Sequence, residues 1–133
     1  MTSKVTYLGG LRTSSIHISS GNEIISDAPI DNNGKGEAFS PTDTVANALA
    51  SCMMTIMGIK ANELKLDLTS STASVTKIMN QDPRRIGCIE VVFEMFGVNE
   101  PKEKTILERV ALSCPVLLSL HPDIDKKIRF NWN

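Results

Sequence analysis

The segment from Ser40 to Glu63 restricts the fold of this chain more than any other stretch. From Val45 to Ile59 nearly every residue is apolar, and the polar exceptions are spaced four residues apart at Asn47, Ser51 and Thr55. A helix that is apolar on nearly every side is a buried helix. At about 1.5 Å per residue such a helix extends roughly 35 Å. We therefore expect it to cross the whole domain.

Three residues at the beginning of this segment predict where the helix starts. Ser40 offers a side-chain oxygen to the unpaired N–H groups of the first turn, and Pro41 presets the φ angle of the first helical residue. Asp43 places a carboxylate near the positive end of the helix dipole. The sequence therefore predicts a helix that begins at Pro41 and is capped by Ser40.

Length and charge favour a single soluble domain, 1–133. A chain of 133 residues can bury a core without disulfides or a metal. The net charge is −1 with both signs interspersed, which disfavours nucleic acid and anionic membrane surfaces as partners. The N-terminus lacks the apolar core of a signal peptide, and Thr, Ser and Gly interrupt the longest apolar run too often for a bilayer span. We expect a cytoplasmic protein.

Local patterns predict the other elements. Runs of β-branched and aromatic residues between turn formers are typical of strands, and the prolines at 101 and 115 can each open a helix. The predicted elements are strands at 4–8, 13–19 and 23–26, the long helix, strands at 66–79 and 85–98, helices at 101–113 and 115–120, and a strand at 128–132. This βββ-α-ββ-αα-β order indicates an α+β fold with an antiparallel sheet around the long helix.

Two of the three cysteines lie where chemistry is plausible. Cys114 precedes Pro115, where the free amides of a helix N-terminus would lower the pKa of a thiol. Cys52 lies in the middle of the long helix and gains almost nothing from the helix dipole. Local physics therefore makes Cys114 the better thiolate. Both residues can equally be small buried apolar side chains, and composition alone favours that interpretation.

The third cysteine and the histidines give no sign of a site. Alternation in the strand at 85–98 places Ile89, Val91, Phe93 and Met95 on the core face and Cys88, Glu90 and Glu94 on the other face. His17 and His121 have no ligand spacing with each other or with a cysteine. We expect neither a metal site nor a cofactor.

Two motifs resemble those of the OsmC/Ohr family. The first is Ser40-Pro41 followed by Ala48-Leu49-Ala50-Ser51-Cys52-Met53, and the second is Cys114-Pro115-Val116. The order of elements is also similar, so the resemblance covers essentially the whole chain. It implies an OsmC-like α+β fold that assembles as an intertwined homodimer with its active sites at the subunit interface.

The resemblance also implies an activity. Family members are thiol-dependent peroxidases for organic and inorganic hydroperoxides, and the apolar helix favours an organic hydroperoxide here. Carried over, Cys52 is the peroxidatic nucleophile and Cys114 the cysteine that resolves it as a disulfide, while Cys88 matches neither. The implied reductant is an external dithiol, either a lipoylated protein or a small thiol.

The family further uses an arginine from the N-terminal strands to hold the thiolate, and Arg12 stands at the matching place. Without the resemblance, Arg12 would be interpreted as a solvated hairpin residue. Family members anchor this arginine with a glutamate at the position that Thr42 occupies here. Either Asp43 supplies the carboxylate or Arg12 is anchored differently. This departure motivates an alternative function, a non-catalytic dimer of the same fold that binds small molecules or senses redox state.

Overall fold

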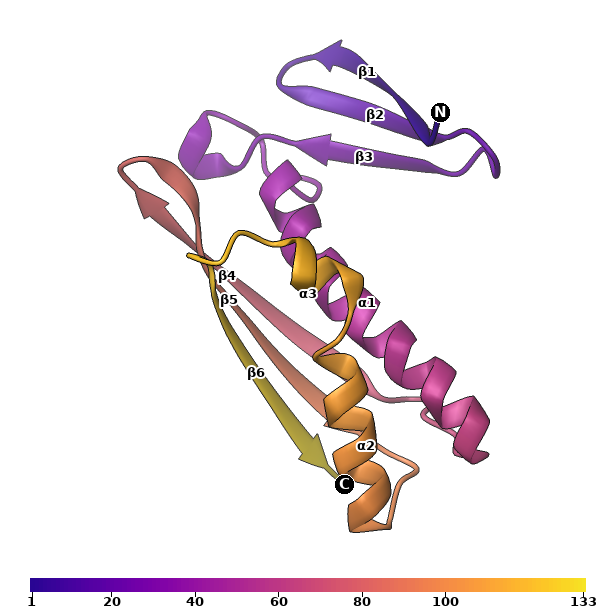
Figure 1. Ribbon diagram of the computed structural model, residues 1–133. Helices are drawn as coiled ribbons and strands as arrows, with labels where there is room; N and C mark the ends of the chain where they lie inside the picture. The colour runs from indigo at the N-terminus through magenta and orange to yellow at the C-terminus, as the bar shows by residue number, and fades with distance from the viewer. The chain divides into compact units, whose positions relative to one another are not determined.

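A computed structural model describes residues 1–133 (Figure 1). The chain forms two compact units, Met1–Val45 and Ala46–Asn133. The helices and strands follow the predicted βββ-α-ββ-αα-β order, with a short 3-10 helix, η1 (Ile30–Asn32), in the loop before the long helix. The predicted α+β class is confirmed.

The unit Met1–Val45 is built on a three-stranded antiparallel sheet. Its strands are β1 (Ser3–Gly9), β2 (Arg12–His17) and β3 (Glu23–Asp27), in the order β1-β2-β3. The turn between β1 and β2 requires positive φ angles at Gly9 and Gly10, which glycine adopts without strain. The strands predicted at 4–8, 13–19 and 23–26 are therefore present, and they form an antiparallel meander.

The unit Ala46–Asn133 contains a second three-stranded sheet. Its strands are β4 (Thr72–Gln81), β5 (Arg84–Met95) and β6 (Asp125–Trp132). β4 and β5 are antiparallel, but β6 is parallel to β5, so the prediction of an antiparallel sheet was wrong at this strand. The reason is the crossover through α2 (Pro101–Ala111) and α3 (Pro115–Ser119), which returns the chain to the other end of the sheet before β6 begins.

The core of this unit lies on one face of β5. The side chains of Ile89, Val91, Phe93 and Met95 are fully buried, as their alternation predicted. A β-bulge interrupts the alternation near Gly87, where the register shifts between Ile78 and Met79 of β4. The extra residue lets Ile86 join the same core as Ile89.

The long helix α1 (Pro41–Leu64) begins where the sequence predicted. The hydroxyl of Ser40 accepts a hydrogen bond from the Asp43 N–H at 3.0 Å, and the Asp43 carboxylate accepts one from the Ser40 N–H at 2.9 Å. This reciprocal pair is a capping box, which satisfies donors that the first turn of a helix leaves open. Pro41 and the other residues up to Val45 belong to the first unit, and the rest of α1 belongs to the second.

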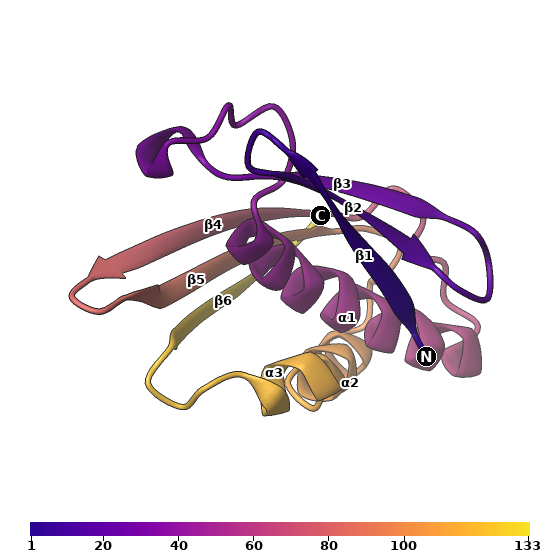
Figure 2. The same ribbon diagram turned by 90° about the horizontal axis from the view of Figure 1, so that it is seen from above.

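The burial of α1 is one-sided within a single chain. A stripe of residues is buried in the core of the second unit: Ala46, Leu49, Ala50, Met53, Met57 and Ala61. Ile59, on another face, is 54% exposed, so the prediction of burial on nearly every side is wrong for the isolated chain. Only one side of the helix meets the β4–β6 sheet and α2, which lies beside α1 in Figures 1 and 2.

The length of α1 bears on the membrane prediction. With 24 residues, the helix is by length and composition apolar enough to cross a bilayer, contrary to the expectation from its Thr, Ser and Gly residues. A third of the most apolar stretch is buried inside the protein. Leu49, Met53 and Met57 within that stretch pack into the core, as they would in the central helix of a folded domain.

Candidate functional site

The structure brings together the two cysteines that the sequence singled out. Cys52 is half-buried on α1, and Cys114 is fully buried at the N-terminus of α3. The two thiols are close enough for Cys52 to raise the pKa of Cys114, and both are free. Both residues belong to the unit Ala46–Asn133. A pair of adjacent free thiols can be oxidised to a disulfide.

The chain between α2 and α3 fixes the position of the Cys114 sulfur. The Cys114 N–H donates to the Ala111 carbonyl at 3.2 Å, which holds the residue against the end of α2. Pro115 then opens α3, and the Leu117 N–H donates to the Cys114 sulfur at 3.2 Å. The predicted helix N-terminus is therefore present, with its amide directed at the thiol.

That amide does not make Cys114 an acidic thiol. Burial raises the pKa of Cys114, and this effect outweighs the hydrogen bond from Leu117, which lowers the pKa. The neighbouring Cys52 raises it further. The expectation that the helix N-terminus lowers the pKa of Cys114 was wrong, because the sequence showed the helix end but not the complete burial of the residue.

The third cysteine, Cys88, is not part of the pair formed by Cys52 and Cys114. It occupies the face of β5 opposite Ile89 and Val91, as alternation predicted, although it is more buried than a polar face suggests. Its thiol donates a hydrogen bond to Asp125 Oδ2, with 3.9 Å between the sulfur and the oxygen. Burial raises the pKa of the Cys88 thiol, so it is protonated at neutral pH. Among residues 1–133, no group of three or more His, Cys, Asp or Glu side chains is arranged to hold a metal ion.

Arg12 is held by two carboxylates of its own unit. Its Nε donates to Asp27 Oδ1 at 2.7 Å and its Nη2 to Asp27 Oδ2 at 2.8 Å, which makes a bidentate ion pair. Nη2 also donates to Glu37 Oε2 at 3.1 Å. The Asp27 side chain is only 2% exposed, whereas that of Glu37 is 64% exposed. Arg12 is therefore an anchored side chain and not a freely solvated hairpin residue.

The ion pair keeps both groups charged. The hydrogen bonds from Arg12 lower the pKa of Asp27 below its ordinary value, more than burial raises it. Asp27 in turn raises the pKa of Arg12. A bidentate pair between a guanidinium and a buried carboxylate combines charge with a fixed planar geometry.

The loop at 28–39 folds back onto this pair. The Glu37 N–H donates to Asp27 Oδ2 at 3.2 Å, and the Gly36 N–H donates to the Ala28 carbonyl at 3.2 Å. Gly34 approaches the chain so closely that a Cβ atom there would lie 1.7 Å from the Ala28 carbonyl oxygen. Glycine is therefore required at 34 for the loop to bring Glu37 to Arg12.

With Thr42 in place of the family glutamate, either Asp43 anchors Arg12 or another group does. Asp43 serves in the capping box of α1, and the carboxylates that contact Arg12 are Asp27 and Glu37. This geometry fits an arginine that is anchored differently. The sequence analysis missed Asp27 and Glu37. The hairpin register was the available signal, because Arg12 and Asp27 are direct cross-strand partners in β2 and β3.

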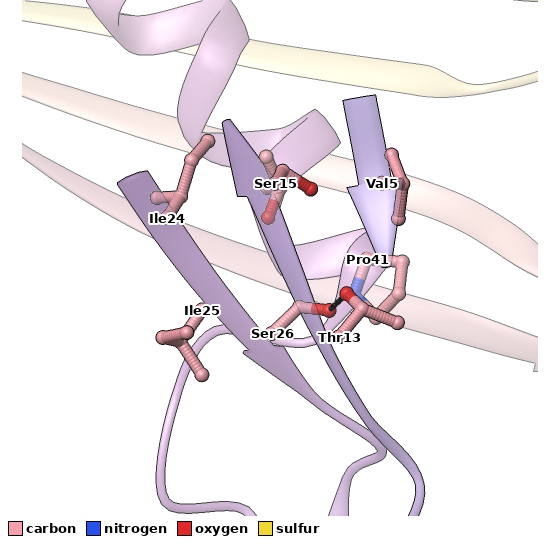
Figure 3. Close-up of a pocket in the computed structure, with 8 residues that line it drawn as sticks. Val5, Thr13, Ser15, Ile24, Ile25, Ser26 and Pro41 are labelled. Atoms are coloured by element: carbon pink, nitrogen blue, oxygen red, sulfur yellow. Dashed lines mark hydrogen bonds between the residues drawn. The ribbon is translucent and has the colours of Figure 1, made fainter. Parts of the chain in front are cut away.

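A cavity of about 350 Å³ lies on the sheet of the first unit (Figure 3). The hydroxyls of Thr13 and Ser26 are hydrogen-bonded at 2.5 Å on its wall. Neither Arg12 nor Asp27 lines the cavity. The lining residues are Val5, Thr13, Ser15, Ile24, Ile25, Ser26, Pro41 and Thr44. No cysteine lines this cavity.

Comparisons with known proteins agree with the fold. The model of the OsmC-like protein family matches residues 34–129. A crystal structure from Psychrobacter arcticus 273-4, provisionally described as an osmotic stress induced and detoxification response protein, is similar with 53% identity and a TM-score of 0.95. That match covers 98% of this chain and 96% of the other.

More distant structures share the fold alone. An OsmC like protein from Mycoplasma pneumoniae has 16% identity and a TM-score of 0.80, over 98% of this chain and 94% of that one. An organic hydroperoxide resistance protein OsmC from Legionella pneumophila has 18% identity and a TM-score of 0.72. That match covers 98% of this chain and 97% of the other. The expected OsmC-like fold is confirmed. The comparison with curated proteins gives no match.

The raised pKa of Cys114 predicts its reactivity. In a variant with Cys52→Ser and Cys88→Ser, we expect the rate of alkylation of Cys114 to reach half its maximum above the ordinary cysteine pKa of about 8.5. A raised pKa leaves the thiol protonated at neutral pH, so alkylation there should be slower than for the same variant in denaturant. The measurement is the pH dependence of iodoacetamide labelling. If the pH midpoint of labelling in the folded variant lay at or below the midpoint in denaturant, the raised pKa of Cys114 would be contradicted.

Proposed function

The chain belongs to the OsmC-like protein family, and on this premise we propose that it is a thiol-dependent peroxidase that reduces organic hydroperoxides. The observation that carries the proposal is the adjacent pair of free thiols, Cys52 and Cys114. The names of two similar structures, a detoxification response protein and an organic hydroperoxide resistance protein, support a peroxide-related role.

The reaction begins at Cys52. Its thiolate attacks the distal oxygen of the hydroperoxide, the O–O bond breaks, and the alkoxide takes a proton and leaves as an alcohol. Cys52 is thereby oxidised to a sulfenic acid. The Cys114 sulfur then attacks the Cys52 sulfur, a disulfide forms, and the hydroxyl leaves as water with the proton of Cys114. The half-buried Cys52 suits the first step, and the enclosed Cys114 suits the second.

An external dithiol completes the cycle. It attacks the disulfide, passes two electrons to it through a mixed disulfide, and leaves both cysteines as thiols. The reductant is a lipoylated protein or a small thiol, and no further cofactor takes part. We place the reaction in the cytoplasm, where the reducing environment keeps such thiols free.

Two residues of the first unit are assigned supporting roles. Arg12 stabilises the Cys52 thiolate and donates a hydrogen bond to the peroxide, which a guanidinium can do because it stays charged and carries several donors. Asp43 contributes through the capping box, since it stabilises the first turn of the helix that carries Cys52.

The working unit is a homodimer. Apolar side chains of the first sheet are exposed in the single chain, with Val5 at 62%, Tyr7 at 64% and Ile24 at 62%. Ile59 of α1 is also largely exposed. A three-stranded sheet needs a covered apolar face to be stable, and a second copy of the chain supplies one.

The dimer predicts a definite hydrodynamic result. Sedimentation at micromolar concentration should show a dimer, held by an interface above roughly 2,000 Å² in total. Ile24→Lys, which puts a charge on the exposed apolar face of the first sheet, should shift the protein toward monomer. Ile78→Lys, the same change at a position 45% exposed on the polar face of β4, is the matched control and should leave the dimer intact. A parent protein that sediments as a stable monomer would refute this assembly.

The disulfide is the direct test of the proposed chemistry. After one equivalent of organic hydroperoxide, mass spectrometry should show Cys52 bonded to Cys114, with Cys88 still open to alkylation after denaturation. In Cys114→Ser the reaction should stop at a sulfenic acid on Cys52 that dimedone traps. A disulfide that includes Cys88 would show that the assignment of the pair is wrong.

A further inference from the structure

The two thiols of the candidate pair differ in how easily they can be reached. Cys114 is 0% exposed and belongs to the core of its unit, whereas Cys52 is half-buried and packs against that core. Both residues lie in the unit Ala46–Asn133. A disulfide between them therefore offers one accessible sulfur and one enclosed sulfur to a thiol from solution.

Hydrogen bonds hold Cys114 in its enclosed position. Its N–H donates to the Ala111 carbonyl at 3.2 Å, and its own carbonyl accepts from the Leu118 N–H at 3.2 Å. The Leu117 N–H donates to its sulfur, also at 3.2 Å. Because the backbone and the sulfur are both held, exposing this sulfur requires a local opening of the chain between α2 and α3. Cys52 needs no such opening, because part of its side chain is already exposed.

We propose that the reducing dithiol attacks the sulfur of Cys52 and that Cys114 is the leaving group, so that the mixed disulfide of the cycle forms on Cys52. The inference rests on the proposed function, which joins these two cysteines in one disulfide. It adds the point at which the reductant enters the site.

Access and pKa act in opposite directions at this disulfide. The site of thiol–disulfide exchange depends on access to each sulfur and on the pKa of the thiol that leaves. Burial raises the pKa of Cys114, which makes it a poorer leaving group than an ordinary cysteine. The Leu117 N–H offsets part of this effect, because it donates to the sulfur on which negative charge develops. Enclosure decides the outcome, since a thiol cannot approach the Cys114 sulfur without the local opening.

The reduction then proceeds in two exchanges. A thiolate of the dithiol bonds to the Cys52 sulfur, the bond between Cys52 and Cys114 breaks, and the electron pair leaves on Cys114, which takes up a proton. The second thiol of the dithiol attacks the sulfur of its own first arm. This step releases the reductant as a cyclic disulfide and Cys52 as a thiolate. Cys114 is thus released first, and Cys52 is released last in the form that attacks the next hydroperoxide.

A monothiol shows directly where the mixed disulfide forms. In a Cys88→Ser variant, which keeps only the two cysteines of the pair, the disulfide is made with diamide and, in parallel, with cumene hydroperoxide. β-Mercaptoethanol is added, and samples taken at successive short times are acidified, unfolded and alkylated with N-ethylmaleimide. Peptide mass spectrometry then identifies the cysteine that carries each group. We expect mercaptoethanol on Cys52 in about tenfold excess or more at the earliest times, because attack at Cys114 requires local opening.

Two controls show whether the fold sets this preference. The same reaction in denaturant leaves both sulfurs accessible, so the two adducts should form in comparable amounts. The parent protein, in which Cys88 is present, should give the same distribution as Cys88→Ser, since Cys88 is not part of the pair.

The outcomes separate this inference from the proposed function. A mixed disulfide mainly on Cys114, or equally on both cysteines at the earliest times, overturns the inference even if the protein reduces hydroperoxides. An excess on Cys52 that persists unchanged in denaturant also overturns it, because burial is then not the cause. If diamide forms the disulfide and the hydroperoxide does not, the proposed peroxidase fails, while an adduct on Cys52 still supports the point of entry. If neither oxidant joins the two cysteines, both proposals fail.

Discussion

The one-sided packing of α1 is the interaction on which the candidate site depends. Leu49, Met53 and Met57 follow one another at helical spacing and are fully buried in the core of the second unit. Cys52 is the neighbour of Met53 and packs at the edge of this stripe, which leaves its thiol half-buried. The same core encloses Cys114 completely. Apolar packing thus places one accessible and one enclosed thiol together.

In the first unit, a buried carboxylate fixes the position of Arg12. The buried carboxylate of Asp27 requires a cation, and Arg12 meets that requirement with two parallel hydrogen bonds. The tight loop through Gly34 then brings Glu37 to the same guanidinium. The guanidinium of Arg12 is thereby held in one planar orientation within its own unit.

The sequence predicted those features that depend on neighbouring residues. The capping box at Ser40 and Asp43 and the core face of β5 are local patterns, and both are confirmed. The parallel pairing of β6 was missed because it depends on the path of α2 and α3 and not on the pattern of the strand. The complete burial of Cys114, which reverses the expected direction of its pKa shift, likewise follows from tertiary packing.

If Cys52 and Cys114 act as a peroxidatic pair, the protein consumes hydroperoxide in the presence of dithiothreitol. We expect continuous turnover by the parent protein and none by Cys52→Ser. Cys114→Ser should consume peroxide in a first turnover and then depend on the added thiol to reduce its sulfenic acid, so its steady rate should fall. A parent protein that forms a stable fold but consumes no peroxide, or a Cys52→Ser variant that consumes it at the parent rate, would rule out this pair as the catalyst and favour a non-catalytic binding or redox-sensing protein.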